Sequence, residues 1–288
     1  MAVCGLFAAM EPLEHRGWET PVRELLEWLE KRQLSSGALP QWDGSRASLL
    51  GTARGVRAWL EGGQWFGEER YTEAAVRAGR WLVGSLLSLE EVPIASFYAL
   101  DPLSALARRT GERSFLQATR QLAERASAWI QNPSDPDAEL SASALGELGW
   151  GLRAVLRWHP TPSVQAAYDQ LVRKALDALR MDGLLPGRFS ARLEPLPVEY
   201  MDVRGALLLA HLWEEKYQQQ REFPFRHAAL RTLELVARLQ SLRTRDAGRY
   251  GAVPAFLPPD RGPAPFSFPT VTACAYLFLL LRLLGANP

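Results

Sequence analysis

Residues 67–83 read GEERYTEAAVRAGRWLV, and residues 111–130 repeat the pattern as GERSFLQATRQLAERASAWI. In both copies a turn glycine and a glutamate precede an amphipathic helical pattern with an aromatic residue in its first turn. Weaker copies begin at Thr161 (TPSVQAAYDQLVRKALDAL) and at Phe223 (FPFRHAALRTLELVARLQ). Repeats of about 40 to 47 residues that contain two helices form stacked hairpins, each of which buries one face against its neighbours. The repeat therefore predicts an all-α fold of helical hairpins.

Two kinds of helix alternate along the chain. Outer helices are amphipathic and carry arginine, glutamate and glutamine, whereas inner helices are apolar nearly all round and rich in small residues that let neighbours approach closely. Outer helices are predicted after an N-cap at Thr20 and at 69–89, 115–131, 163–181 and 225–242. Inner helices are predicted at 48–61, 93–109, 139–158, 198–216 and 269–284. The pattern thus predicts five helices of each kind.

Composition narrows the class of protein. The 288 residues carry 33 basic and 32 acidic side chains, so no net charge attracts nucleic acid or an anionic membrane. The two cysteines, Cys4 and Cys274, cannot form a disulfide framework, and no spacing suggests zinc. The apolar run 271–281 is about half the ~20 residues that a membrane span needs. We expect a cytoplasmic protein without a membrane span, a metal or a cofactor.

Three connections from an outer to an inner helix share one formula: Gly37-Ala-Leu-Pro40, Gly183-Leu-Leu-Pro186 and Gly251-Ala-Val-Pro254. The glycine reverses the chain, and the proline prevents helix until the next cap. Combined with the GEERYTEAA type of outer helix, this formula resembles the α/α-toroid proteins: the six-hairpin glycosidases, uronic-acid-processing hydrolases and epimerases, and more distantly the terpenoid cyclases. The resemblance covers roughly residues 20–285.

The resemblance implies one domain over residues 1–288, in which a ring of five or six hairpins surrounds a central cavity. The ring is either incomplete or closed by the N-terminal segment, residues 1–19. Because a ring brings its first and last elements together, we expect Cys4 and Cys274 to lie near each other as reduced thiols. The implied site lies at one mouth of the cavity, where the inner helices begin. Helix dipoles and free amides also collect at that end.

The first inner-helix entrance offers Gln41, Trp42, Asp43 and Arg46. A tryptophan beside carboxylate and amide groups is typical of a sugar subsite, with the indole stacking on the ring and the polar groups taking hydroxyls. The structural alternative is that Trp42 covers the end of the fold and that Asp43-Gly44 is only a turn.

The second and third entrances offer further candidates. Phe97 and Tyr98 are possible stacking walls, and Asp101 is either a binding group or a helix cap. Glu147 lies on an apolar helix, where burial would raise its pKa into the range of a general acid. The alternative for Glu147 is an ion pair with an arginine such as Arg54.

The fourth entrance holds the densest polar cluster: Glu199, Tyr200, Asp202 and Arg204. Glu199 and Asp202 at i and i+3 would share a helix face, with Arg204 lowering the pKa of one carboxylate while the other keeps its proton. Two carboxylates of unlike pKa are what glycoside cleavage requires. We predict Glu199 and Asp202 as the catalytic pair, with Asp43 in reserve; the alternative is a capping network.

The sequence lacks the DxDD and DDxxD motifs of terpenoid cyclases and prenyltransferases, which disfavours those enzymes. Toroidal epimerases place histidines on inner helices, and here only His211 lies near one. The favoured function is a glycoside hydrolase or polysaccharide lyase that takes a saccharide, or another small molecule, in the central cavity. The alternative is a non-catalytic toroid that binds a saccharide or a protein, and the oligomeric state stays open.

Overall fold

The computed structural model describes residues 16–41, 44, 46–88, 94–241, 251–264, 267 and 270–283. Cys4, Trp42 and Asp43 lie outside the described residues, and so does the predicted meeting of Cys4 with Cys274. Cys274 itself is half-buried, and burial raises the pKa of its thiol.

Ten α-helices are present in the described part of the chain, and they alternate as the sequence predicts. The outer helices are α2 (Glu19–Lys31), α4 (Glu69–Leu87), α6 (Arg113–Gln131), α8 (Pro162–Asp177) and α10 (Phe223–Leu239). The inner helices are α3 (Leu49–Phe66), α5 (Leu100–Thr110), α7 (Ala142–Leu156), α9 (Val203–Gln220) and α11 (Thr270–Leu283). Two 3₁₀ turns, η1 (Arg16–Trp18) and η2 (Ile94–Ala99), precede α2 and α5.

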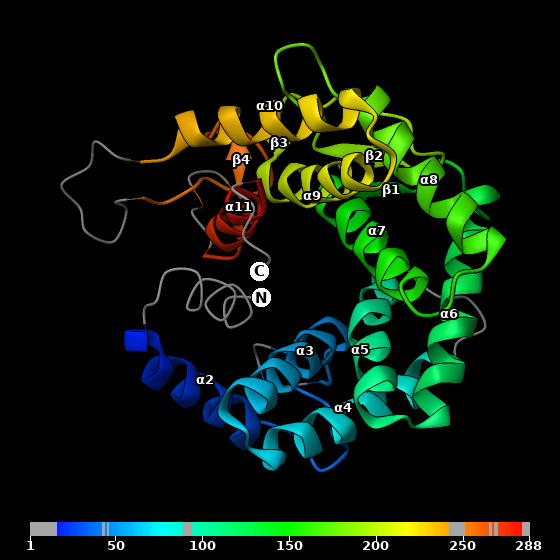
Figure 1. Cartoon of the computed structure of the whole chain (residues 1–288), viewed down its shortest axis with the longest axis vertical. Helices are drawn as coiled ribbons and strands as arrows, with labels where there is room; N and C mark the ends of the chain where they lie inside the picture. Colours follow the sequence, from blue (N-terminus) through cyan, green and yellow to red (C-terminus); the bar gives the residue numbers. More distant parts are fainter. Residues whose placement is uncertain are drawn as a thin grey trace. The chain divides into compact units, whose positions relative to one another are not determined.

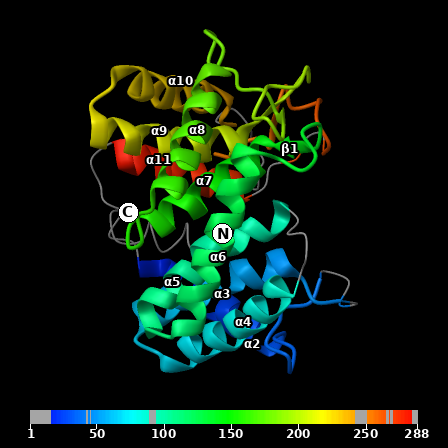
Figure 2. The same cartoon turned by 90° about the vertical axis from the view of Figure 1, so that its right-hand side faces the viewer.

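The contacts of the chain separate into two compact units. The first unit consists of the described residues up to Ser127 together with Gly151–Gln165. The second consists of Ala128–Trp150 and the described residues from Ala166 on. In the first unit α3 packs against α4 and α5. In the second unit α9 packs against both α10 and α11, and these three helices lie next to one another in Figures 1 and 2.

The repeated stretch forms equivalent outer helices. Tyr71, Phe115 and Phe225 occupy the same place in the first turn of α4, α6 and α10, and each is at most 2% exposed. The residue that ends the preceding inner helix has a left-handed backbone each time, at Gly67 (φ 69°), Gly111 (φ 69°) and Arg221 (φ 60°). The hairpin repeat is thus a repeat of turn geometry as well as of helices.

The Gly-x-x-Pro connections also repeat one geometry. Gly37, Gly183 and Gly251 have φ of 92°, 85° and 78°, a region that favours glycine. In each turn the residue after the glycine accepts a backbone hydrogen bond from a residue two or three positions past the outer helix: Leu34 to Ala38 (2.9 Å), Arg180 to Leu184 (2.9 Å) and Ser241 to Ala252 (3.0 Å). The three turns therefore share one backbone conformation and one hydrogen bond before the chain enters the inner helix.

Several inner helices begin later than the sequence predicts. The helix predicted from residue 93 begins at Leu100, because Pro102 cannot donate to an i−4 carbonyl and is tolerated only in a first turn. The helices predicted from residues 139 and 198 begin at Ala142 and Val203. Thr20 is not the N-cap of α2, since the helix already begins at Glu19 after η1.

The displaced residues form two short antiparallel strand pairs that the sequence did not predict. Strand β1 (Glu139–Ser141) pairs with β2 (Arg188–Ser190), and β3 (Met201–Asp202) pairs with β4 (Phe256–Leu257). Both pairs join an inner-helix entrance to a residue stretch that follows a Gly-x-x-Pro turn. They fix the entrances of α7 and α9.

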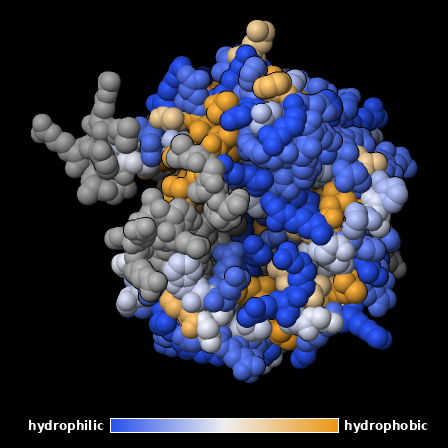
Figure 3. All heavy atoms as spheres, viewed as in Figure 1, coloured by the Kyte–Doolittle hydropathy of each residue, from blue (hydrophilic) through white to orange (hydrophobic). Residues whose placement is uncertain are grey.

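The face shown in Figure 3 is mostly hydrophilic, with scattered hydrophobic residues. No helix in the described part of the chain has the length and apolar character to cross a membrane.

Candidate functional site

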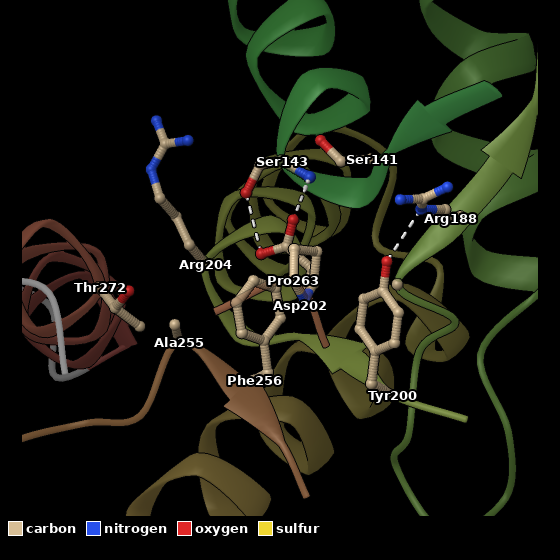
Figure 4. Close-up of a pocket in the computed structure, with 11 residues that line it drawn as sticks. Ser141, Ser143, Arg188, Tyr200, Asp202, Arg204, Ala255, Phe256, Pro263 and Thr272 are labelled. Atoms are coloured by element: carbon tan, nitrogen blue, oxygen red, sulfur yellow. Dashed lines mark hydrogen bonds between the residues drawn. The ribbon is translucent and has the colours of Figure 1, made fainter. Parts of the chain in front are cut away.

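A pocket of about 320 Å³ opens in the second unit where α7, α9 and α11 begin (Figure 4). We name it the α7–α9 pocket. Its volume lies at the lower end of the roughly 300–1,000 Å³ of small-molecule sites. It is lined by Ser141, Ser143, Gly187, Arg188, Tyr200, Asp202, Arg204, Ala255, Phe256, Pro263 and Thr272.

Glycine brings the two inner helices together at the pocket. A Cβ atom at Gly205 would lie 2.3 Å from the backbone of Ala142 and Ser143, so only glycine fits where α9 meets α7. Along the same contact, a Cβ atom at Gly146 would lie 2.7 Å from Leu208. The small residues on these inner helices therefore produce the close approach that their sequence predicts.

Asp202 caps both helices. It is the N-cap of α9 and accepts a hydrogen bond from the Gly205 amide at 3.0 Å. It also accepts from the amide and from the hydroxyl of Ser143, in the first turn of α7, each at 2.9 Å. Burial raises the pKa of the Asp202 carboxyl, and the hydrogen bonds from Gly205 and Ser143 oppose that rise.

The strand pairs bring polar and aromatic side chains to the pocket beside Asp202. Arg188 on β2 donates to the Tyr200 hydroxyl at 2.9 Å, and the Tyr200 ring meets the Phe256 ring edge to face at 5.5 Å. A Cβ atom at Gly187 would lie 2.4 Å from the Tyr200 ring, so this glycine makes room for it. Figure 4 shows Tyr200 and Phe256 on the side of the pocket away from Ser141.

Each arginine of the pocket already has a carboxylate. Arg188 pairs with Glu139 across the β1–β2 ladder, and Arg204 pairs with Glu147 on α7. The Arg204 and Glu147 side chains are 10% and 15% exposed, so water screens this pair little. The pocket therefore has polar groups without an uncompensated positive charge.

The structure brings together part of the predicted fourth cluster. Tyr200, Asp202 and Arg204 all line the α7–α9 pocket. Glu199 does not: its side chain is 78% exposed and pairs with Arg261. The expectation that Glu199 and Asp202 share a helix face is wrong, because α9 begins only after Asp202, which acts as its cap. The Arg204 side chain pairs with Glu147, so the alternative expected for Glu147, an ion pair with an arginine of a neighbouring inner helix, is present.

The other predicted residues belong to the first unit. Gln41 and Arg46 are exposed and joined by a backbone hydrogen bond of 2.6 Å. Phe97 is buried at 2% exposure, and Tyr98 is half-buried. Asp101 is not the cap of α5, since Ala99 holds that position; Asp101 lies in the first turn, 3.5 Å from Arg57. Their role in binding stays a prediction.

Sequence reasoning missed Arg188 and Phe256 as parts of the site, and it did not select Thr272 as a site residue. The signal for Arg188 and Phe256 was present in the turn formula. The second residue after the turn proline is Trp42, Arg188 or Phe256 in the three connections, and only the first of these was selected. Both described members of this set line the pocket.

No group of three or more histidine, cysteine, aspartate or glutamate side chains suited to a metal occurs among the described residues. His211, the histidine on an inner helix, is 1% exposed and packs edge to face on Trp150 at 5.4 Å.

No protein-family model matches the sequence, and a comparison with curated proteins finds no match. Solved structures do match. A cellobiose 2-epimerase from Bacillus thermoamylovorans B4167 superposes with a TM-score of 0.75 at 11% identity, over 97% of this chain and 86% of that one. An unsaturated glucuronyl hydrolase from Bacillus sp. GL1 gives 0.71 at 13%, over 96% and 83%. An α-1,6-mannanase from Salegentibacter sp. HEL1_6 gives 0.66 at 13%, over 79% and 72%.

These similarities confirm the predicted fold: the chain has the all-α, α/α-toroid architecture of the six-hairpin glycosidase type. At 10–13% identity they extend to the fold and not to a reaction. The neighbours are carbohydrate-active proteins of more than one activity, epimerase and hydrolase among them.

Proposed function

We propose that this chain is a carbohydrate-active protein that binds a neutral sugar ring in the α7–α9 pocket. One observation carries the proposal: the pocket combines the Tyr200–Phe256 aromatic pair with several hydroxyl groups and with arginines that already have partners. Aromatic rings contact the apolar C–H face of a sugar, and a few placed polar groups fix its orientation.

The charges favour a neutral sugar over a uronate. A sugar carboxylate in the pocket would have to compete with Glu139 for Arg188 or with Glu147 for Arg204. The Arg204–Glu147 pair is largely buried, so breaking it would leave a poorly solvated charge. This would reduce the free energy of binding by about 3 kcal/mol. A sugar hydroxyl needs neither displacement.

The test compares matched ligands and matched variants. Methyl glycosides of glucose, galactose and mannose, cellobiose, and the methyl glucuronide are screened by thermal shift and by calorimetry. We expect a neutral sugar to bind at least about tenfold more tightly than its uronate counterpart. The change Phe256→Ala should weaken binding, whereas Phe223→Ala, at a ring 64% exposed on α10 and outside the pocket, should not. Tighter binding of the uronate, or equal loss in both variants, would contradict the proposal.

Glycoside cleavage is a second candidate function, favoured by the raised pKa of buried Asp202. A carboxyl group that keeps its proton can donate it to a glycosidic oxygen. Hydrolysis also needs a second carboxylate. We assign that role to Glu147, which is bound to Arg204 of the pocket, rather than to exposed Glu199.

If the protein is a hydrolase, Asp202→Asn and Glu147→Gln should each lower turnover by ~10² or more while sugar binding survives. Glu199→Gln is the matched control and should leave turnover unchanged. A binding module would show no reducing-end release with any sugar that binds.

A further inference from the structure

Thr272 lies at the start of α11 on the pocket wall. Its side chain is 1% exposed, and its hydroxyl has no hydrogen-bond partner in the part of the chain that the structure describes. Figure 4 shows it on the side of α11 turned toward Ala255 and Arg204, and all three line the pocket. A buried hydroxyl without a partner destabilises a protein by about 1–3 kcal/mol, so most such groups are satisfied.

Two other buried hydroxyls on helices of this chain, those of Thr119 and Ser127, are satisfied within their own helix. Thr119 donates to the Phe115 carbonyl at 2.7 Å and Ser127 to the Ala123 carbonyl at 2.8 Å, each four residues earlier. Thr272 is the third residue of α11, so its i−4 residue precedes the helix. The usual internal partner is therefore not in place for this hydroxyl.

An unpartnered buried threonine is not by itself a binding group, as Thr232 shows. Thr232 is fully buried in α10, its hydroxyl also lacks a partner among the described residues, and it does not line the pocket. What distinguishes Thr272 is its place in a pocket large enough for a ligand. The two residues thus form a natural pair: the same side chain and the same lack of a partner, with Thr272 in the pocket wall and Thr232 outside it.

The other polar groups of the pocket are partly occupied. The Ser143 hydroxyl donates to Asp202, the Tyr200 hydroxyl accepts from Arg188, and the Ser141 hydroxyl accepts from the Ala144 amide. Thr272 has both its donor and its acceptor capacity available. A sugar hydroxyl also both donates and accepts, so the two groups are complementary.

We propose that Thr272 determines specificity in the α7–α9 pocket by hydrogen bonding to one hydroxyl of the bound sugar ring. The inference rests on the proposed function, because it names the group that reads the ligand of that site. A site built to pair with a ligand hydroxyl rejects the analogue that lacks it, since its own buried group is then left unpaired. Thr272 would accordingly select sugars by the presence and configuration of that hydroxyl.

The experiment measures Kd by calorimetry for the tightest neutral sugar, and thermal stability without ligand, in the wild type, Thr272→Val, Thr272→Ser and Thr232→Val. Valine keeps the shape of threonine and removes the hydroxyl. We expect Thr272→Val to weaken binding about tenfold or more, Thr272→Ser to stay within about threefold of the wild type, and Thr232→Val to leave binding unchanged. Both valine variants should melt no lower than the wild type.

A series of monodeoxy sugars identifies the hydroxyl. One deoxy position should bind weakly to the wild type and lose no further affinity in Thr272→Val, which is the coupling that a direct contact gives. Equal affinity of wild type and Thr272→Val for every sugar, with binding still lost in Phe256→Ala, would overturn the role of Thr272 and leave the proposed function standing. A panel in which no saccharide binds would overturn both.

Discussion

The carboxylate of Asp202 accepts hydrogen bonds from the backbone amide and from the hydroxyl of Ser143, 59 residues earlier in the chain, each at 2.9 Å. The same carboxylate caps α9 through the Gly205 amide. One buried side chain thus satisfies the first turns of two inner helices, whose amides would otherwise lack acceptors.

Asp202→Ala should therefore lower the free energy of unfolding by about 3 kcal/mol, because it removes a cap and leaves buried donors unpaired. Asp202→Asn should lower it less, since the amide oxygen still accepts. The measurement is urea unfolding followed by circular dichroism. Asp101→Ala is the control: this half-exposed aspartate pairs with Arg57 at 3.5 Å, and its loss should change stability by under about 1 kcal/mol. Equal effects of Asp202→Ala and Asp101→Ala would show that the double cap contributes nothing.

The raised pKa of Asp202 predicts how the contribution of this residue to the free energy of unfolding depends on pH. Burial lifts the pKa in the folded protein above its ordinary value of 3.8, so the folded state holds this proton more tightly than the unfolded state. Stability from that proton is present below pH 3.8 and is lost as the pH rises through the folded pKa. The stability of the wild type relative to Asp202→Asn should thus fall as the pH is raised from 3.8 through the folded pKa. A difference that grows with pH would show that the hydrogen bonds, rather than burial, set the pKa.

The close contact of α7 and α9 predicts that one methyl group added at Gly205 strongly destabilises the protein. Gly205→Ala places a Cβ atom 2.3 Å from the backbone of Ala142 and Ser143, which cannot move without separating the helices. We expect a loss of about 3 kcal/mol or more, as for severe overpacking, and weaker sugar binding. Gly84→Ala is the matched control, since nothing lies within 4 Å of a Cβ atom there, in an exposed turn of α4. It should raise stability by up to about 1 kcal/mol through helix propensity. Comparable unfolding curves for the two variants would contradict the packing argument.

The fold could be predicted from the sequence because its signals are local. The repeat, the amphipathic and apolar periods and the turn glycines each act within one hairpin, and the helices follow them. The helix starts were less accurate where a cap decided the boundary. At α9, for example, Asp202 is a residue type that favours the N-cap position. Pro195 and Pro197 indicate extended chain before it, so both features predict the later start of the helix.

The site was harder to predict because its partners are distant in the chain. Arg204 finds Glu147 from 57 residues away, and Glu199 finds Arg261 from 62 residues away. Sequence spacing placed Glu199, Asp202 and Arg204 in one cluster, but the pairings that set their charge depend on which helices and strands pack together. The pocket wall from Arg188 and Phe256 likewise exists only through the β1–β2 and β3–β4 pairs.

Arg221 stands where two equivalent hairpins have glycine. The C-cap is Gly67 in α3 and Gly111 in α5. In α9 the C-cap is Arg221 at φ 60°, a conformation that is unfavourable by about 1–2 kcal/mol for a residue with a Cβ atom. The Arg221 guanidinium lies over the Tyr217 ring, 5.5 Å from its centroid. Arg221→Gly and Arg221→Ala both remove that contact and differ only in the Cβ atom.

We therefore expect the Gly variant to be more stable than the Ala variant by about 1 kcal/mol, the reverse of the usual order in a helix. Urea unfolding of the two variants measures the difference directly, and Arg226→Ala serves as the control that removes a second guanidinium from the same ring, 4.9 Å from its centroid, at an ordinary helical position. If Arg221→Ala is as stable as Arg221→Gly or more stable, the left-handed backbone at the C-cap of α9 does not lower the stability of this hairpin. The argument from the turn geometry shared by the repeats would then be wrong.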